Sequence, residues 1–339
     1  MSMNLDFLRT VAVLCVFFAH LLQAFGWQNV GMIGMCGVVI FFVHSSLVLM
    51  GSLQRLEKRA ASRRSLIFDF WVRRFFRLYP LLLLSVLAAI IFRIPIFPGF
   101  PYVWIGWKAL AANLTMTQNL TRDISILSPL WSLPLEAQMY IVLPLAYLAV
   151  RGAWRYRTMS LWVVSLLLAF TLSRFSPRLS IFAYAPCFGA GILAFGLVAS
   201  MKSKPRLPGW VWPVGVLLLL AIFGYPGRLQ RHEILMHSAL AVALGLLYPN
   251  VKEHDWGALQ RVFHWVVERS YGIYLSHIAV FWLVVDVMGR DPLWVRIVVL
   301  VAGSIGIPAV LYAAVEKPVI AARSRLAVQL FRPRVASAV

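Results

Sequence analysis

The sequence predicts an all-α membrane protein, a bundle of about ten transmembrane helices with both termini in the cytoplasm. Of its 339 residues, 61% are hydrophobic and 13% are charged, whereas soluble domains are nearer 45–50% apolar and about 25% charged. Ten apolar segments meet or approach the roughly 20 residues that span a bilayer. Because no polar stretch is long enough for a soluble domain, we expect one integrated domain.

The predicted spans follow one another along the chain at residues 5–27, 33–53, 78–94, 134–150, 159–175, 180–199, 210–225, 233–249, 270–288 and 294–315. The fifth, seventh and eighth are short. The outer connection at 95–133 is long and aromatic, and we expect interfacial or re-entrant helices there. Residues 1–318 are expected to form the transmembrane domain and 319–339 a basic cytoplasmic tail, with no fused extracytoplasmic domain.

The charge balance predicts the orientation. The formal charge is +20, from 32 Lys and Arg against 12 Asp and Glu. In a soluble protein this excess would suggest nucleic acid, but here the positive-inside rule explains it and no nucleic-acid partner is expected. Most basic residues fall in connections that face the cytoplasm if the N-terminus does. The three cysteines lie in apolar runs without metal-ligand spacing, so neither a disulfide nor a metal site is expected.

Arg9 and His20 are the first polar residues that lipid should exclude. They lie eleven residues apart in one predicted helix, which corresponds to about 1100° of rotation and about 16 Å of rise. Both side chains therefore share a face, with Arg9 at the cytoplasmic boundary and His20 deep in the membrane. The simpler alternative makes Arg9 an interfacial anchor and His20 a packing residue.

Two further clusters carry charge. Arg73, Arg74 and Arg77 precede the third span; guanidinium groups hold phosphate bidentately, although such boundaries also bind anionic lipid headgroups. Glu136 lies near the outer start of the fourth span, with Tyr140 one turn deeper. A carboxylate there needs a partner, and a histidine from another helix would serve, unless the carboxylate is exposed among the headgroups.

A fourth cluster lies in the ninth span. Ser270, Tyr274 and His277 follow an i, i+4, i+7 pattern and so share one helix face. A polar stripe of this kind packs helices together as readily as it lines a channel. His44 is a further intramembrane histidine.

In their order along the chain, these clusters resemble the motifs of acyltransferase family 3, membrane proteins that O-acylate cell-surface glycans and some small molecules. The matching motifs are "LDFLRTVAVLCVFFAH", "RFFR" before "LYP", "WSLPLEAQMY" and "SYGIYLSH", and "EKP" after the last span also fits. The resemblance extends from Leu5 to Pro318. It departs at "FFVHSS", where Ser46 replaces a glycine that in many members permits close helix approach.

The resemblance implies roles for individual residues. His20 is expected to be the general base, Arg9 to lie on the acyl-donor side, and Glu136 to be a third catalytic residue. The acyl-CoA site is expected at Arg73, Arg74 and Arg77, and supporting residues at Trp131, Ser132, Tyr140, Tyr274, His277 and Ser46.

The expected function is therefore transfer of an acyl group, with acetyl favoured, from cytoplasmic acyl-CoA to a hydroxyl of an extracytoplasmic glycan such as lipopolysaccharide O-antigen or exopolysaccharide. The expected location is the bacterial cytoplasmic (inner) membrane. Acyl-CoA is a donor substrate, and no permanently bound cofactor is expected. The other expected partners are membrane lipids, a glycan or lipid-linked saccharide acceptor, and possible cooperation with a separate extracytoplasmic enzyme.

Two other classes of function remain open at this point. A transporter or channel would use His20, Glu136 and His277 as a polar pathway. Its typical sign is a pair of inverted repeats, which the sequence does not contain. A membrane scaffold would explain the basic inner face but not the buried histidines.

Overall fold

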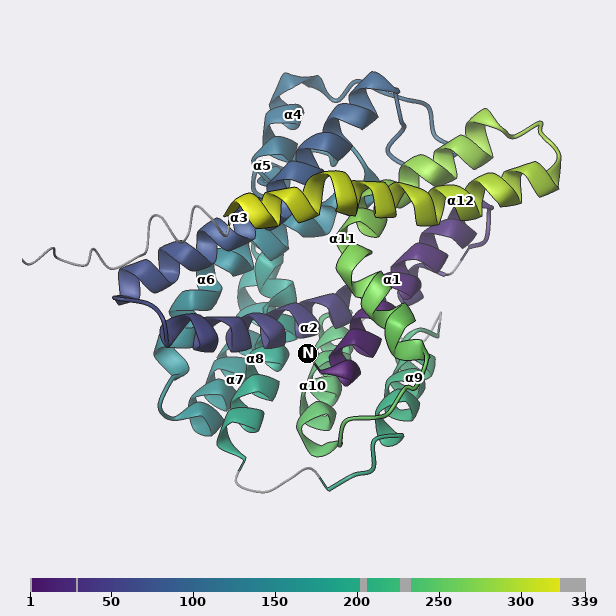
Figure 1. Cartoon of the computed structure of the whole chain (residues 1–339). Coiled ribbons are helices and arrows are strands. Elements are labelled where there is room, and N and C mark those ends of the chain that lie inside the picture. The colour runs from purple at the N-terminus through teal and green to yellow at the C-terminus, as the bar shows by residue number, and fades with distance from the viewer. Residues whose placement is uncertain (1, 29, 202–205, 226–232, 324–339) are drawn as a thin grey trace, which may run out of the picture.

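The computed structural model describes residues 2–28, 30–201, 206–225 and 233–323. Within these ranges the regular structure is helical, apart from one isolated bridge between Leu207 and Val251. The helices pack as one bundle, and α12 lies across one side of it (Figure 1). The prediction of an all-α polytopic membrane protein is confirmed.

The helices have the following bounds. The long ones are α1 (Met3–Ala24), α2 (Gly31–Glu57), α3 (Arg63–Ile91), α6 (Leu133–Val150), α7 (Trp154–Thr171), α8 (Ser180–Ser200), α9 (Val211–Phe223), α10 (Glu233–Leu247), α11 (Leu259–Trp282) and α12 (Leu293–Leu311). The short ones are α4 (Gly106–Leu114), α5 (Gln118–Thr121), η1 (Ser128–Ser132), η2 (Leu172–Arg174), η3 (Pro177–Leu179), η5 (Tyr248–Asn250) and the π-helical turns η6 (Leu283–Val287) and η7 (Tyr312–Glu316).

All ten predicted spans coincide with helices. Seven helical stretches are long and apolar enough to cross a membrane, namely Met3–Ala24, Gly31–Glu57, Arg63–Ile91, Ser128–Val150, Pro177–Ser200, Leu259–Val287 and Leu293–Arg323. The remaining three predicted spans fall on α7, α9 and α10, which are shorter or less apolar. The number of crossings and the side on which the termini lie stay predictions.

Helix α3 begins well before the apolar run at 78–94. Ser62 caps its N-terminus, because its Oγ accepts a hydrogen bond from the backbone N–H of Ser65 at 3.1 Å and so satisfies one of the free donors at a helix start. The extension carries the arginine cluster on a rigid helix rather than on a flexible connection. The helix therefore fixes the position of the three arginines along the bundle.

Small residues bring the central helices α1, α2 and α8 into close contact. A Cβ atom added at Gly37 would lie 2.8 Å from the carbonyl oxygen of Ala12, and one added at Gly191 would lie 2.2 Å from that of Val43. Close backbone approach of this kind is typical of helix packing in membranes. Ser46 causes no loss of packing, because its hydroxyl donates to Phe42 O at 2.9 Å and Gly191 provides the space.

The connection at 95–133 folds into the short helices α4, α5 and η1 (Figure 1), and their place at the membrane interface stays a prediction. Asn113 is buried and ties the segment together: its Nδ2 donates to Ile124 O at 2.8 Å, and its Oδ1 accepts from Ile126 N at 3.0 Å. The Asp286 carboxylate accepts from the Gly99 N–H at 3.0 Å. The segment is therefore fastened to η6, the π-helical turn that follows α11.

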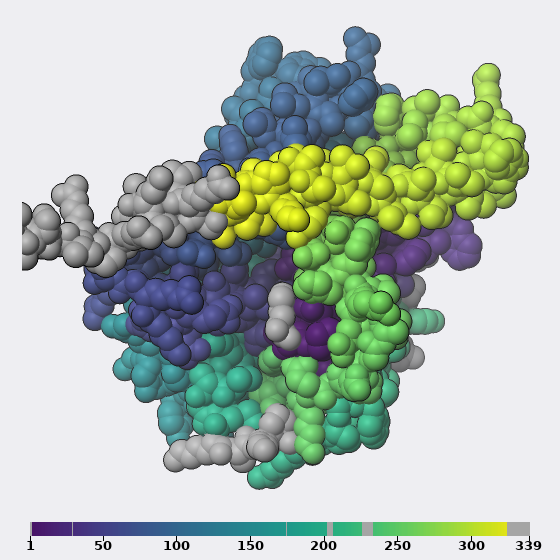
Figure 2. Space-filling view, viewed as in Figure 1, coloured from purple at the N-terminus to yellow at the C-terminus, as the bar shows by residue number. Residues whose placement is uncertain are grey.

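Helix α12 forms an outer surface of the protein. Between Leu293 and Leu311 only Pro308 is buried, and Figure 2 shows this helix lying on the outside of the bundle. An apolar helix that is exposed on most sides is suited to lipid. Of the predicted tail at 319–339, residues 319–323 continue the helix and residues 324–339 lie outside the described residues.

Candidate functional site: an arginine cavity and a histidine pair

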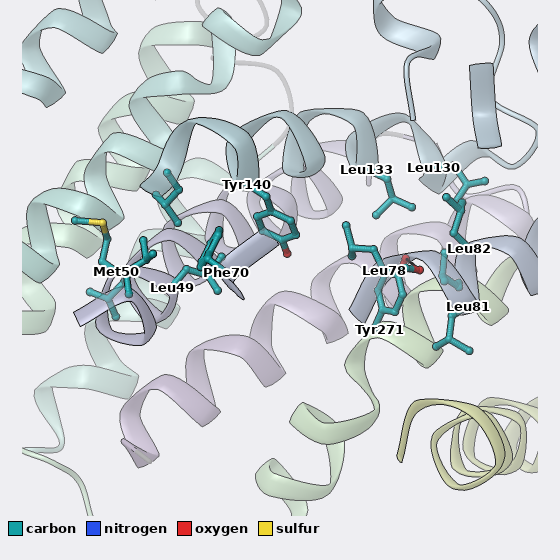
Figure 3. Packing of buried hydrophobic residues seen from close by; sticks show 14 of the residues in the cluster. Leu49, Met50, Phe70, Leu78, Leu81, Leu82, Leu130, Leu133, Tyr140 and Tyr271 are labelled. Carbon is teal, nitrogen blue, oxygen red and sulfur yellow. Dashed lines mark hydrogen bonds between the residues drawn. The ribbon is translucent and has the colours of Figure 1, made fainter. Parts of the chain in front are cut away.

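A cavity lies between α1, α2, α3, α6 and α11. It has about 770 Å³ of empty space, counting its open mouth. Its charged and polar lining consists of Arg9, Arg74, Arg77, Glu136, Ser45, Ser132, Tyr140, Ser270, Tyr271 and Tyr274. The apolar part of the wall consists of Val38, Phe41, Phe42, Val48, Leu49, Leu78 and Leu133. Figure 3 shows its three leucines near Tyr140 and Tyr271. We refer to this space as the arginine cavity.

Arg9 joins α1 to α11 inside the arginine cavity. Its Nε donates a hydrogen bond to Ser270 Oγ at 2.8 Å, and its guanidinium carbon lies 5.8 Å from the centre of the Phe41 ring. The ring supplies a cation–π contact, and the hydroxyl uses one of the five N–H donors of the guanidinium. The other donors remain for a ligand in the cavity.

Arg74 and Arg77 approach the cavity from α3. Arg74 lies beside the rings of Phe70 and Tyr140, with its guanidinium carbon 5.7 Å and 5.9 Å from their centres. Arg77 forms an ion pair with the buried carboxylate of Glu316. Both arginines line the same space, because residues three apart on a helix are neighbours.

Arg73 differs from its two neighbours. Its Nε donates to Asp69 Oδ1 at 2.9 Å, one turn earlier on α3, and Arg73 is not among the residues that line the arginine cavity. The structure therefore separates it from the predicted donor site. The reason is helical periodicity, because adjacent residues on a helix point about 100° apart.

Glu136 lies in the arginine cavity, where its carboxylate accepts a hydrogen bond from the Tyr140 hydroxyl. The sequence analysis predicts a histidine from another helix as its partner, or else an exposed carboxylate. Instead Tyr140, four residues along the same helix, takes that place, since residues four apart on a helix are neighbours. Among the described residues, the hydrogen-bond partner of His20 is His277, and Glu136 bonds to neither histidine.

His20 of α1 and His277 of α11 form a hydrogen-bonded pair. His20 Nδ1 and His277 Nε2 lie 2.9 Å apart, and the two rings are stacked at 11° with their centres 5.1 Å apart. The ring of Phe97, from the outer connection, packs edge-on against His20 with centroids 5.9 Å apart. The predicted common face of α1 is thus confirmed, because Arg9 and His20 both meet α11.

The hydrogen bonds of this histidine pair fix which nitrogens carry protons when both rings are neutral. His277 Nδ1 lies 3.2 Å from the carbonyl oxygen of Ile273, and a carbonyl oxygen only accepts. His277 therefore holds its proton on Nδ1 and accepts at Nε2, which means that His20 donates from Nδ1. His20 is left with an unprotonated Nε2, the form that a general base needs.

Tyr274 connects the histidine pair to the arginine cavity. It lines the cavity, and its ring centre lies 6.1 Å from that of His277. Its hydroxyl donates to the carbonyl oxygen of Pro129 and consequently accepts from Ser132, whose Oγ is 2.8 Å away. These bonds join α11 to the "SPLWS" turn and hold the tyrosine ring in place.

Two predicted supporting residues lie outside this constellation. Trp131 packs against Tyr184 of α8, with ring centres 5.6 Å apart, and Ser46 serves helix packing. Conversely, the sequence motifs predict no role for Glu316, although this residue is the glutamate of the matching "EKP". No spacing rule links Glu316 to Arg77, because the two lie 239 residues apart in the chain. Across the described residues, no group of three His, Cys, Asp or Glu could hold a metal ion.

Comparison with known proteins agrees with this architecture. Residues 4–313 match the family described as "Acyltransferase domain". The chain belongs to this family. The resemblance inferred from the motifs is therefore confirmed over nearly the whole chain.

Curated relatives extend the comparison. The peptidoglycan O-acetyltransferase OatA of Listeria monocytogenes is 25% identical over 93% of this chain and 55% of its own length. The putative peptidoglycan O-acetyltransferase YrhL of Bacillus subtilis is 28% identical over 93% and 54%. The acyltransferase MdmB of Streptomyces mycarofaciens is 33% identical over 44% and 40%. The chain thus spans about half the length of the curated relatives it matches, and no solved structure matches it.

Proposed function

We propose that this membrane protein is an O-acyltransferase that moves an acetyl group from cytoplasmic acetyl-CoA to a hydroxyl of an extracytoplasmic glycan, in the bacterial cytoplasmic membrane. The observation that carries the proposal is the hydrogen-bond series from the Ile273 carbonyl through His277 to His20. It leaves a base on α1, which together with α11 is one of the five helices around the arginine cavity. Membership of the acyltransferase family supports the same chemistry.

The donor binds in the arginine cavity in this proposal. Arg9, Arg74 and Arg77 supply cationic groups for the phosphates of CoA, and Arg73 is left out because it is paired with Asp69. The acyl end then extends along α11, past Tyr274, toward the histidine pair. From Ser270, which Arg9 contacts, to His277 the helix rises about 10 Å.

Transfer follows from the proton positions. His20 Nε2 takes the proton of the acceptor hydroxyl as the oxygen attacks the thioester carbonyl. The carbon–sulfur bond breaks, CoA leaves as a thiolate, and the imidazolium returns its proton to the sulfur. The products are an O-acetyl ester and CoA thiol, and neutral His20 is restored. Throughout, His277 Nε2 accepts the hydrogen bond from His20 Nδ1–H and so stabilises the imidazolium form of His20.

Glu136 has no proton-transfer step in this scheme, in contrast to our expectation of a catalytic carboxylate. It lies among the arginines and is hydrogen-bonded to Tyr140. Its negative charge partly balances Arg9 and Arg74 when the donor is absent. A carboxylate in this position also disfavours anions that cannot pair with all three guanidinium groups.

The acceptor enters from the outer side, where Phe97 of the connection 95–133 contacts His20. Two of the relatives are named as peptidoglycan O-acetyltransferases, one of them as putative, which makes peptidoglycan the first acceptor to test. Lipopolysaccharide O-antigen and exopolysaccharide are the next. A separate extracytoplasmic enzyme would complete the transfer if none of these is acetylated directly.

Thiol release from acetyl-CoA tests the proposal. Purified protein in detergent is mixed with acetyl-CoA and digested peptidoglycan, and free CoA is followed with a thiol reagent. We expect acceptor-dependent release that is lost in His20→Ala. His254→Ala is the matched control, because His254 lies in a connection and packs against Trp256, away from the histidine pair. Equal rates in His20→Ala and the wild type would overturn the role of the base.

A further inference from the structure

We infer that Glu316 is the positioning residue for Arg77, and that it acts from behind the arginine cavity to aim this guanidinium at an anionic donor group. The inference rests on the proposed function, because the anion that Arg77 meets is taken to be a phosphate of CoA. It names a role for the glutamate of the "EKP" motif, which belongs neither to the histidine pair nor to the lining of the cavity.

Arg77 has two sides in the fold. On one side it lines the arginine cavity together with Arg9 and Arg74. On the other it borders a small hollow between α3 and the end of α12, whose lining includes Glu316, Phe76 and Pro80. Glu316 is absent from the lining of the arginine cavity. The carboxylate therefore holds the arginine without reaching a ligand in the cavity.

The contact between them is a charge-assisted hydrogen bond. Arg77 Nη1 donates to Glu316 Oε2, and the glutamate side chain is 3% exposed while that of the arginine is 22% exposed. Bonds between ionised groups are stronger and more directional than neutral ones. Because a single Nη1 hydrogen is enough for this bond, several N–H donors of the guanidinium remain for a ligand.

Burial explains why such a partner is needed. Three guanidinium groups line one cavity, and like charges at short range in a poorly solvated space oppose one another. A long arginine side chain also has many rotamers, and fixing one of them costs conformational entropy at the moment of binding. Glu316 offsets both effects beforehand, because it supplies a counter-charge and holds one rotamer.

The end of α12 is built to deliver this carboxylate. Glu316 closes the π-helical turn η7, a local irregularity often found at functional sites. Tyr312 begins the same turn, and its hydroxyl donates to Glu268 Oε1 of α11 at 2.9 Å. Gly272 of α11 lies beside it, since a Cβ there would be in ordinary van der Waals contact with Glu316 Oε1, 3.6 Å away. Contacts to α3 and α11 therefore locate Glu316, although α12 is otherwise exposed.

Direct binding of the donor tests this inference. The probes are CoA and adenosine 3′,5′-bisphosphate, which carries phosphates but no pantetheine arm, titrated by calorimetry into the full chain in detergent. We expect Glu316→Gln, which keeps the shape but loses the charge, to weaken both probes by about tenfold or more. Glu316→Asp should weaken the binding of both probes less. In both variants, kcat at saturating acetyl-CoA should stay near the wild-type value.

Two controls separate positioning from damage to the fold. Glu57→Gln removes the carboxylate of the Arg151–Glu57 ion pair, which joins α2 to α6 outside the arginine cavity, and should leave both affinities unchanged. If Glu316 acts through Arg77, the double variant with Arg77→Gln should bind as weakly as Arg77→Gln alone. Size-exclusion profiles identify any variant that fails to fold.

The possible outcomes are distinct. Wild-type affinity in Glu316→Gln would overturn the positioning role, and tighter binding would show that the carboxylate competes with the donor. Multiplicative losses in the double variant would also contradict it. Failure of the wild-type protein to bind either probe would instead refute the donor site of the proposed function.

Discussion

His277 provides the most informative single perturbation of the proposed mechanism. The residue is 2% exposed, and its Nε2 accepts a hydrogen bond from His20 Nδ1–H across 2.9 Å. Replacing it by glutamine sets an amide oxygen close to the Nε2 position. Replacing it by asparagine ends the side chain near Nδ1, where it does not reach His20. The glutamine amide can therefore accept the hydrogen bond from His20 Nδ1, and the asparagine amide cannot.

The size of the effect follows from that contact. A buried His20 N–H that has no acceptor destabilises this tautomer of His20 by about 1–3 kcal/mol. The ring is then free to adopt the other tautomer. Because about 1.4 kcal/mol corresponds to tenfold in rate, we expect kcat in His277→Asn to fall by roughly ten- to a hundredfold. His277→Gln should stay within about threefold of the wild type.

Acetyl-CoA turnover with digested peptidoglycan is the assay, run at saturating donor so that kcat is read separately from KM. The KM for acetyl-CoA should change little in either variant, since His277 does not line the arginine cavity. Equal losses in the glutamine and asparagine variants would refute the tautomer argument. Wild-type rates in both would refute any role for the pair.

Three further predictions follow from the same geometry. Arg74→Gln should raise the KM for acetyl-CoA about tenfold, whereas Arg73→Gln should leave it unchanged, because Arg74 lines the cavity and Arg73 does not. Steady-state kinetics measures both values. Tyr274→Phe should lower thermal stability by about 1 kcal/mol or more, measured by melting in detergent, since it leaves Ser132 and the Pro129 carbonyl without their common partner. Gly191→Ala should destabilise by about 1–3 kcal/mol through the clash with Val43 O; an unchanged melting temperature would contradict the close α2–α8 contact.

The sequence predicts the fold largely because a bilayer restricts the alternatives. Every apolar segment of about 20 residues coincides with a helix, including the short segments on α7, α9 and α10. Hydropathy does not predict where these helices begin. Helix α3 starts at Arg63 because Ser62 caps it, and α11 starts at Leu259, upstream of its apolar run. Both helices therefore begin several turns before the apolar runs that predict them.

The site was predictable in part for the same physical reason. Ionisable residues within a membrane need partners or water, so Arg9, His20 and His277 stand out in the sequence. Which of them meet is a different question. His20 and His277 lie 257 residues apart, and helical periodicity relates residues only within one helix. The ion pair of Glu316 with Arg77 was missed for this reason, whereas Tyr140, the partner of Glu136, lies four residues along the same helix and was within reach of helical periodicity.

In the proposed mechanism, one chain carries an acetyl group from a cytoplasmic donor to an acceptor on the other side of the membrane. The direct measurement uses proteoliposomes with acetyl-CoA sealed inside and digested peptidoglycan outside, followed by mass spectrometry of the external glycan. The account predicts acetylated external glycan with CoA thiol retained inside, and neither product with His20→Ala. External acetylation that persists in His20→Ala, or that requires acetyl-CoA and glycan on the same side, would contradict it.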